Sequence, residues 1–285
     1  MNTDGTLNAV LLLIGYGYLG ITSLIFCTQR KLQYFPDHHE YHLQKVDKYT
    51  HFTARASDGV ILKGVYLPRV REGVFNTLTL LHLHGNAGNV FHRIPWATGI
   101  QRNFGCGVVL LDYRGFGGSI GAINEAGLVL DAIAGVDWIT QNLSASEEIV
   151  LHLESIGSAV GLKALPKLGA QLRGCVIEGG LPSCIEIAQD LFPFFPVKFL
   201  MKDGWGETCY SAQENTRNID VLSLHGALDQ IVPLHFGRKL FHALGSSKKT
   251  MHVFPRGGHN NLSSQPGYIG ALKAFYSTGT KTVVT

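Results

Sequence analysis

The chain has 285 residues, of which 45% are hydrophobic and 16% charged, and its formal net charge is only +3. This length and apolar content suffice for one large folded domain or two small ones, and they exclude an intrinsically disordered chain. The small net charge, without any basic run, argues against a nucleic-acid partner. The five cysteines are widely spaced and form no CxxC pair, which indicates neither a zinc site nor a disulfide framework.

The N-terminal stretch predicts a membrane anchor. No charged residue occurs from Gly5 to Gln29, and the apolar run over residues 7–27 would measure about 31 Å as a helix, which matches the hydrocarbon core of a bilayer. A cleaved signal peptide is disfavoured because no Lys or Arg precedes the run and no small-x-small cleavage site ends it. A buried core helix is the weaker alternative. We therefore expect a transmembrane helix over residues 1–30 and a linker over residues 31–48.

Basic residues lie on one side of this anchor only. Those nearest to it all follow it: Arg30, Lys31, Lys45 and Lys48. Because such residues concentrate on the cytoplasmic side of membranes, they predict a single-pass protein whose main domain faces the cytosol. The sequons at Asn142 and Asn261 would be used only in a lumenal domain, so lumenal placement is the alternative. The bilayer is the partner that these residues indicate, and they leave the oligomeric state open.

From residue 49 onward, strand-like and helix-like stretches alternate, which predicts an α/β fold with helices on both faces of a mostly parallel sheet. The clearest helix covers residues 125–143, where apolar residues recur at steps of three and four. Functional side chains are expected directly after strands, because ligand sites gather at the carboxyl ends of parallel strands. Short apolar runs predict strands within residues 58–67, 77–85, 106–115, 147–154, 173–180, 219–226 and 250–258.

Three residues of complementary chemistry follow three of these strands, in the order Ser155, Asp229, His259. This is the chain order of the α/β-hydrolase triad, in which the histidine takes the proton of the serine and the carboxylate holds and stabilises the histidine. A lone Asp in a turn or a lone His after glycine would be unremarkable. Three such residues, each after its own strand, are hard to attribute to chance, so we expect them to be catalytic.

Backbone amides that could stabilise an oxyanion are expected at two places. A helix begins directly after Ser155, so the amide of Ile156 lies in its first turn, where negative charge is stabilised. The glycines of HGNAGN, residues 84–89, let the chain turn sharply and point the amide of Asn86 or Ala87 outward.

Other polar side chains near the strands are expected to have structural roles. His84 closes a buried strand, where histidines are usually hydrogen-bonded parts of the structure. Asp112 and Arg114 are expected to brace loops. The three histidines of DHHEYH, residues 37–42, are irregularly spaced and lie in the expected linker, so we expect no metal there.

The turn around the expected nucleophile departs from the usual GxSxG pattern. Gly157 supplies the second glycine around Ser155, but Leu153 replaces the first. The neighbouring Ser158 is the weaker candidate, since isoleucine and valine occupy its flanking positions. A leucine beside such a strained turn must find room or shift the turn. Leu153 is thus the main argument for the alternative of a pseudohydrolase that binds a lipid or protein partner.

From TQRKLQYFP, which begins at residue 28, to its C-terminal helix, the chain resembles the membrane-anchored α/β-hydrolase-domain proteins related to the yeast bud-emergence hydrolase, with the protein depalmitoylases as more distant relatives. HGNAGN, YRGFGGSIG, HGALDQIVP and GGHNNL carry the resemblance, whereas LESIGS stands where the family has GxSLGG. The resemblance implies an α/β-hydrolase fold, a membrane anchor and a serine nucleophile. It also implies acyl-proteins as one possible substrate, although the N-terminal cysteine cluster of the depalmitoylases is missing.

A small cap is expected at about residues 181–215, within a hydrolase domain over residues 49–285. The segment is too long for one loop and rich in aromatic residues and prolines. Phe192, Phe195 and Phe199 could line an acyl-chain pocket there, or could merely pack the cap on the sheet. With the anchor, this favours a serine hydrolase that cleaves a small-molecule or acyl-protein ester or thioester, through an acyl-enzyme and without a metal or organic cofactor.

Overall fold

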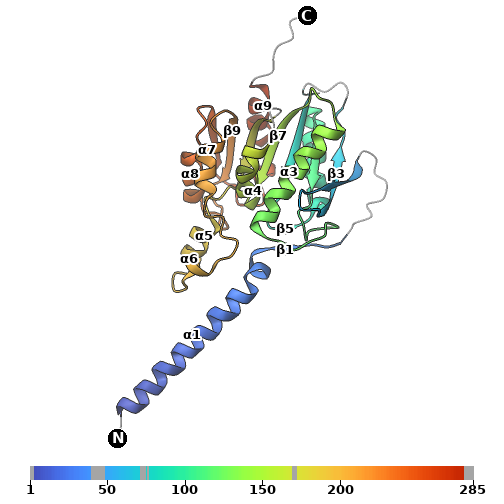
Figure 1. Cartoon of the computed structure of the whole chain (residues 1–285). Helices are drawn as coiled ribbons and strands as arrows, with labels where there is room; N and C mark the ends of the chain where they lie inside the picture. Colours follow the sequence, from blue (N-terminus) through green and yellow to red (C-terminus); the bar gives the residue numbers. More distant parts are fainter. Residues whose placement is uncertain (1–2, 40–48, 71–74, 76, 169–171, 279–285) are drawn as a thin grey trace, which may run out of the picture.

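An eight-stranded sheet forms the centre of the molecule (Figure 1). The computed structural model describes residues 3–39, 49–70, 75, 77–168 and 172–278. Along the sheet the strands follow the order β10-β9-β8-β7-β4-β6-β3-β2, and neighbours are parallel except that β3 runs antiparallel to β2 and β6. The strands are β2 (Thr50–Arg55), β3 (Ile61–Leu67), β4 (Leu78–Leu83), β6 (Gly107–Leu111), β7 (Glu148–Glu154), β8 (Leu172–Glu178), β9 (Asp220–Gly226) and β10 (Lys249–Phe254).

The expected mostly parallel α/β sheet is confirmed, and all but one of its strands coincide with the predicted ones. The exception is the edge strand β2, in which only Ala54 is buried, so its sequence contains no apolar run that would predict a strand. Because β4, β7, β9 and β10 are parallel, the residues that follow them meet at one edge of the sheet.

Helices cover both faces of the sheet (Figure 1). Successive side chains of a strand point to opposite faces, and in β4 Leu81 and Leu83 join one core whereas Leu78 and Leu80 join the other. The helices α3 (Glu125–Asn142), α4 (Ile156–Ala164), α7 (Thr208–Asn215) and α8 (Leu234–Ala243) pack into the first core, and α2 (Ile94–Phe104) and α9 (Tyr268–Ser277) into the second. Short 3-10 helices occupy Val90–Arg93, Leu165–Lys167 and Leu262–Ser264.

Helix α1 (Thr3–Gln33) extends away from the sheet as a long rod (Figure 1). By length and composition it could cross a membrane, and no residue of its most apolar window is buried by the described chain. The expected linker over residues 31–48 needs correction at its start. Here the helix continues, and β1 (Phe35–Pro36) then pairs in parallel with β5 (Ala87–Gly88), which fixes the end of α1 to the HGNAGN loop. Residues 40–48 lie outside the described residues.

The cap is smaller than the expected 181–215. Only α5 (Cys184–Leu191) and α6 (Val197–Leu200) leave the edge of the sheet, and they lie beside α1 (Figure 1). Helix α7 instead packs into the core with α4 and α8, because its Ala212 is fully buried there.

Candidate active site

Ser155, Asp229 and His259 form a hydrogen-bonded chain at the carboxyl edge of the sheet. Nε2 of His259 lies 3.0 Å from Oγ of Ser155, and Nδ1 of His259 lies 2.7 Å from Oδ2 of Asp229. When Nδ1 carries the imidazole proton and donates a hydrogen bond to the carboxylate, Nε2 is unprotonated and can accept the proton of the serine hydroxyl. The three residues come from the ends of β7, β9 and β10, so the parallel topology brings them together.

Asp229 is held as a carboxylate. Its Oδ1 accepts hydrogen bonds from the backbone amides of Ile231 at 2.9 Å and Val232 at 2.8 Å. Burial opposes the ionisation of Asp229, but the hydrogen bond and charge of His259 together with the two amides outweigh it, so the pKa of Asp229 lies below its usual value. A negative charge is therefore available to stabilise an imidazolium.

Ser155 sits on the sharp turn from β7 into α4. Its φ of 54° and ψ of −118° place it in the region that favours glycine, which is a strained conformation for a serine. Gly157 permits this turn, because a Cβ there would clash with the carbonyl oxygen of Leu83. The hydroxyl of Ser158 donates to the carbonyl of Ser155 at 2.6 Å and accepts from the amide of Leu181 at 3.2 Å. Ser158 thus stabilises the turn by linking Ser155 to Leu181.

Leu153 finds room without displacing this turn. Its side chain is fully buried and lies against Gly161, one and a half turns into α4. A Cβ at Gly161 would clash with Cδ2 of Leu153 and would come within 2.9 Å of its Cδ1. The glycine in the helix therefore supplies the space that a glycine in the strand would otherwise leave, and Ser155 keeps both its strained backbone and its hydrogen bond to His259.

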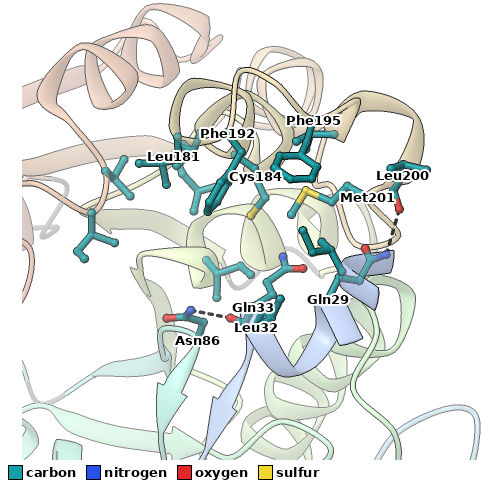
Figure 2. A pocket seen from close by; sticks show the side chains of 18 of the residues that line it. Gln29, Leu32, Gln33, Asn86, Leu181, Cys184, Phe192, Phe195, Leu200 and Met201 are labelled. Carbon is teal, nitrogen blue, oxygen red and sulfur yellow. Dashed lines mark hydrogen bonds between the residues drawn. The ribbon is translucent and has the colours of Figure 1, made fainter. Parts of the chain in front are cut away.

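Two of the three expected oxyanion donors lie beside the serine. Asn86 and Ile156 line the same pocket as Ser155, and Ile156 opens α4, so its amide has no acceptor within the helix. Ala87, by contrast, is exposed and lies outside the pocket lining. The Asn86 loop is fixed by the end of α1: the Phe35 amide donates to the Asn86 carbonyl at 2.8 Å, and Nδ2 of Asn86 donates to the carbonyl of Gln33 at 2.7 Å (Figure 2).

An apolar cavity of about 700 Å³ opens from Ser155 between the cap and α1 (Figure 2). Phe192 and Phe195 lie in its lining, but Phe199 does not. In the short helix α6, Val197 and Leu200 share the face toward the cavity, so Phe199 points away and is 84% exposed. Helix α1 supplies the opposite wall with Thr22, Ile25, Phe26, Gln29, Leu32 and Gln33.

Charged contacts that the sequence did not indicate support the site. Arg93 binds Glu154, the residue before the expected nucleophile, through contacts of 2.8 and 3.2 Å, and His82 lies 3.3 Å from the same carboxylate. Burial opposes ionisation of Glu154, but His82 and Arg93 outweigh it and hold the pKa of its carboxyl well below the usual value. The position of Glu154 at the buried end of a strand, directly before the serine, was the available signal.

A second such contact ties α1 to the domain. Nε of Arg30 lies 2.7 Å from Oδ2 of the buried Asp203, whose other oxygen accepts from the amide of Glu125 at 3.0 Å. Nε2 of Gln33 also donates to the carbonyl of Asp203 at 2.9 Å. The wall that α1 gives to the cavity is therefore anchored by an ion pair near the C-terminal end of the helix.

The remaining polar residues have local partners. Nδ1 of His84 lies 2.7 Å from the carbonyl of Gly85, and burial lowers the pKa of His84 to about 3. Asp112 accepts from the Val90 amide at 2.9 Å, and Arg114 pairs with Asp131 and Asp58. Within the described residues no group of three or more His, Cys, Asp or Glu side chains is arranged to hold a metal ion, and His42 lies outside those residues.

Comparison with known proteins gives relatives over most of the chain, although no family model matches it. The chain is 30% identical over 234 residues to Protein bem46 of Schizosaccharomyces pombe, covering 80% of this chain and 76% of that protein. It is 31% identical over 202 residues to an uncharacterized membrane protein of Saccharomyces cerevisiae, with 70% and 71% covered. Uncharacterized protein YfhR of Escherichia coli is 29% identical over 212 residues, with 73% and 72% covered.

Solved structures share the fold at lower identity. An esterase of Pyrococcus furiosus, Pf2001, superimposes with a TM-score of 0.66 at 17% identity, covering 85% of this chain and 99% of that one. A serine hydrolase without lid from Xanthomonas campestris gives a TM-score of 0.58 at 16% identity, with 80% and 94% covered. The likeness shows that the sheet and its helices form an α/β-hydrolase fold.

Proposed function

The chain belongs to the family of Protein bem46, and from that premise we propose that it is a membrane-anchored serine hydrolase that cleaves acyl esters or thioesters. The observation that carries the proposal is the chain of hydrogen bonds from Asp229 through His259 to Ser155, which lies in the lining of an apolar cavity. The cavity volume lies within the range of small-molecule sites, and its apolar lining suits an acyl chain.

The reaction proceeds in two halves. Oγ of Ser155 attacks the acyl carbonyl while Nε2 of His259 takes the hydroxyl proton, and the amides of Asn86 and Ile156 stabilise the oxyanion. His259 then returns the proton to the departing alcohol or thiol, which leaves the acyl group on Ser155. In the second half His259 takes a proton from a water molecule, whose oxygen attacks this ester. His259 then returns the proton to Oγ of Ser155 as the bond to the acyl carbon breaks, which releases the carboxylic acid and restores the free serine.

Helix α1 holds the domain on a membrane as a single transmembrane pass. The basic residues that follow it support a cytosolic position for the domain. The alternative function, a pseudohydrolase with a displaced nucleophile, loses its main support, because Gly161 accommodates Leu153 and the serine retains its contact with His259.

The proposal is tested by labelling the detergent-solubilised full chain with a fluorophosphonate probe. We expect the wild type to label, Ser155→Ala and His259→Ala to lose labelling, and Ser158→Ala to label more slowly, because its hydroxyl only braces the turn. Thermal unfolding of each variant serves as the control for folding. A folded wild type that does not label would overturn the proposal.

A further inference from the structure

The cap runs far along α1. Its outer end touches Tyr18, whose hydroxyl donates to the carbonyl of Phe194 at 2.9 Å and whose ring stacks on Phe195 with centroids 5.7 Å apart. Its inner end is held by Gln29, which donates to the carbonyl of Leu200 at 3.0 Å (Figure 2). From Gln29 to Tyr18 the helix rises about 16 Å. The cap therefore lies alongside more than three turns of α1.

The part of α1 that extends beyond the cap is too short to cross a bilayer by itself. A hydrocarbon core is about 30 Å thick and needs about 20 helical residues. If the membrane ended at the outer end of the cap, only residues 5–17 of the uncharged stretch would lie within it, which is about 20 Å of helix. If it extends to Phe26 instead, residues 7–26 span about 30 Å. Helix α1 thus spans the core only when the cap tip lies inside the near leaflet.

The surface of the cap tip suits that position. Phe194 is 87% exposed, Phe199 84% and Leu191 63%, and all three belong to the segment from the end of α5 through α6. Large apolar side chains exposed so close together in the chain are unfavourable in water and favourable in hydrocarbon. At the level of Phe26, Nζ of Lys202 lies 4.3 Å from the Phe26 ring centroid, where an ammonium group could reach lipid phosphates.

We propose that the cap tip, residues 191–200, is inserted into the membrane and that the cavity opens sideways into the leaflet, so that a long acyl chain reaches Ser155 from the bilayer and not from water. The cavity wall formed by Thr22, Ile25 and Phe26 lies at membrane depth by the same measure. The insertion stands on α1 and the cap alone, whereas the entry of substrate rests on the proposed hydrolase function. The occupant of the apolar surface is the lipid acyl region.

Insertion is tested first, without reference to activity. The full chain is reconstituted in phosphatidylcholine vesicles with and without brominated acyl chains, and tryptophan quenching is compared for wild type, Phe194→Trp and Tyr210→Trp. Tyr210 is also exposed but lies on α7, outside the cap. We expect the added tryptophan at 194 to be quenched several-fold more than the one at 210, after subtraction of the wild-type signal. Equal quenching at the two positions would overturn the insertion.

Entry of the substrate is tested with Phe194→Asp and Phe199→Asp, with Tyr210→Asp as the matched control. Because a charge in the acyl region is costly, we expect both cap variants to hydrolyse a palmitoyl ester held in vesicles at least about tenfold more slowly, while hydrolysis of a water-soluble acetyl ester and probe labelling stay at wild-type rates. An unchanged rate on the palmitoyl ester would overturn bilayer entry and leave the hydrolase intact. A folded wild type that does not label would instead overturn the proposed hydrolase function. The quenching experiment would still test membrane insertion in that case.

Discussion

At the scale of single residues, the strained serine turn depends on the combined side-chain volume of Leu153 and Gly161. Leu153 fills the strand side of the contact with α4, and Gly161 leaves the helix side empty. A leucine in the strand and a side chain in the helix at that point exclude each other. The identity of the residue two before the serine is therefore not, by itself, a measure of whether the serine works.

This mutual exclusion predicts a specific pattern of stability. We expect Leu153→Ala to lower the free energy of unfolding by about 2–5 kcal/mol through loss of packing, and Gly161→Ala to lower it by about 1–3 kcal/mol through overpacking. The double variant should be more stable than the sum of the two losses, by about 1 kcal/mol or more. Denaturant unfolding in detergent measures all four proteins. A Leu153→Gly variant that labelled faster than wild type would contradict the account, since the leucine would then be distorting the turn.

Asp112 predicts a dependence of stability on pH. Burial raises the pKa of its carboxyl to about 7, although the Val90 amide opposes this, whereas the same group in the unfolded chain titrates near 3.8. Between these values the folded chain binds a proton that the unfolded chain has released, so stability falls as the pH rises from about 4 to 7 and is level above. We expect Asp112→Asn to remove this fall and to be more stable than wild type at pH 8 by on the order of 2–4 kcal/mol.

Thermal unfolding between pH 5 and 9 checks this expectation about Asp112, with the exposed Asp190→Asn as control. The control should follow the wild-type curve throughout. Parallel curves for wild type and Asp112→Asn would show that the buried carboxyl is ionised in the folded protein.

At the scale of elements, the sequence was sufficient where one element could be judged alone. Apolar runs predicted the strands β3, β4, β6, β7, β8, β9 and β10. The placement of Ser155, Asp229 and His259 after three of them predicted that these residues would meet. The edge strand β2 was missed because edge strands bury little, and here only Ala54 is covered. Periodicity and composition do not indicate which polar or weakly apolar residues contact residues that are distant in the chain.

The same limit explains the errors at α1 and the cap. A linker was expected from residue 31, but Gln33 and Phe35 contact a loop more than fifty positions away in the chain. The ion pair of Arg30 with Asp203 bridges 173 positions. For Phe199, composition suggested an apolar pocket, yet its place on α6 turned the ring outward. Each of these outcomes depends on the docking of two elements.

The docking of α1 predicts an effect of Arg30 on the site. Removing its side chain leaves the buried carboxylate of Asp203, among the described residues, with the Glu125 amide as its hydrogen-bond donor, and removes one of the contacts that hold the last turns of α1. We expect Arg30→Ala to lower stability by about 2–4 kcal/mol and to slow probe labelling, because the Asn86 loop is held by those turns. Arg30→Lys should recover part of both losses, and Lys31→Ala, one residue on, should change neither. Unchanged labelling in a destabilised Arg30→Ala protein would show that α1 does not position the loop.

At the scale of the whole molecule, the sequons report the side of the membrane. Asn142 and Asn261 are both exposed, so both could be modified in a lumenal domain. For a cytosolic domain we expect no change in gel mobility on treatment with endoglycosidase, in wild type and in Asn142→Gln or Asn261→Gln alike. An upward shift abolished by the enzyme would place the domain in the lumen, and the two variants would identify the site.

The short pairing of β1 with β5 also predicts that the reaction rate at Ser155 depends on the thickness of the membrane. A transmembrane helix whose apolar length differs from its bilayer tilts to reduce the mismatch. Helix α1 ends two residues before the strand that holds the Asn86 loop, and its last turns wall the cavity. A change of tilt would therefore shift an oxyanion donor and a cavity wall relative to Ser155, so labelling rates should differ between thin and thick vesicles. The lipid composition of a compartment would then set how fast the same chain works.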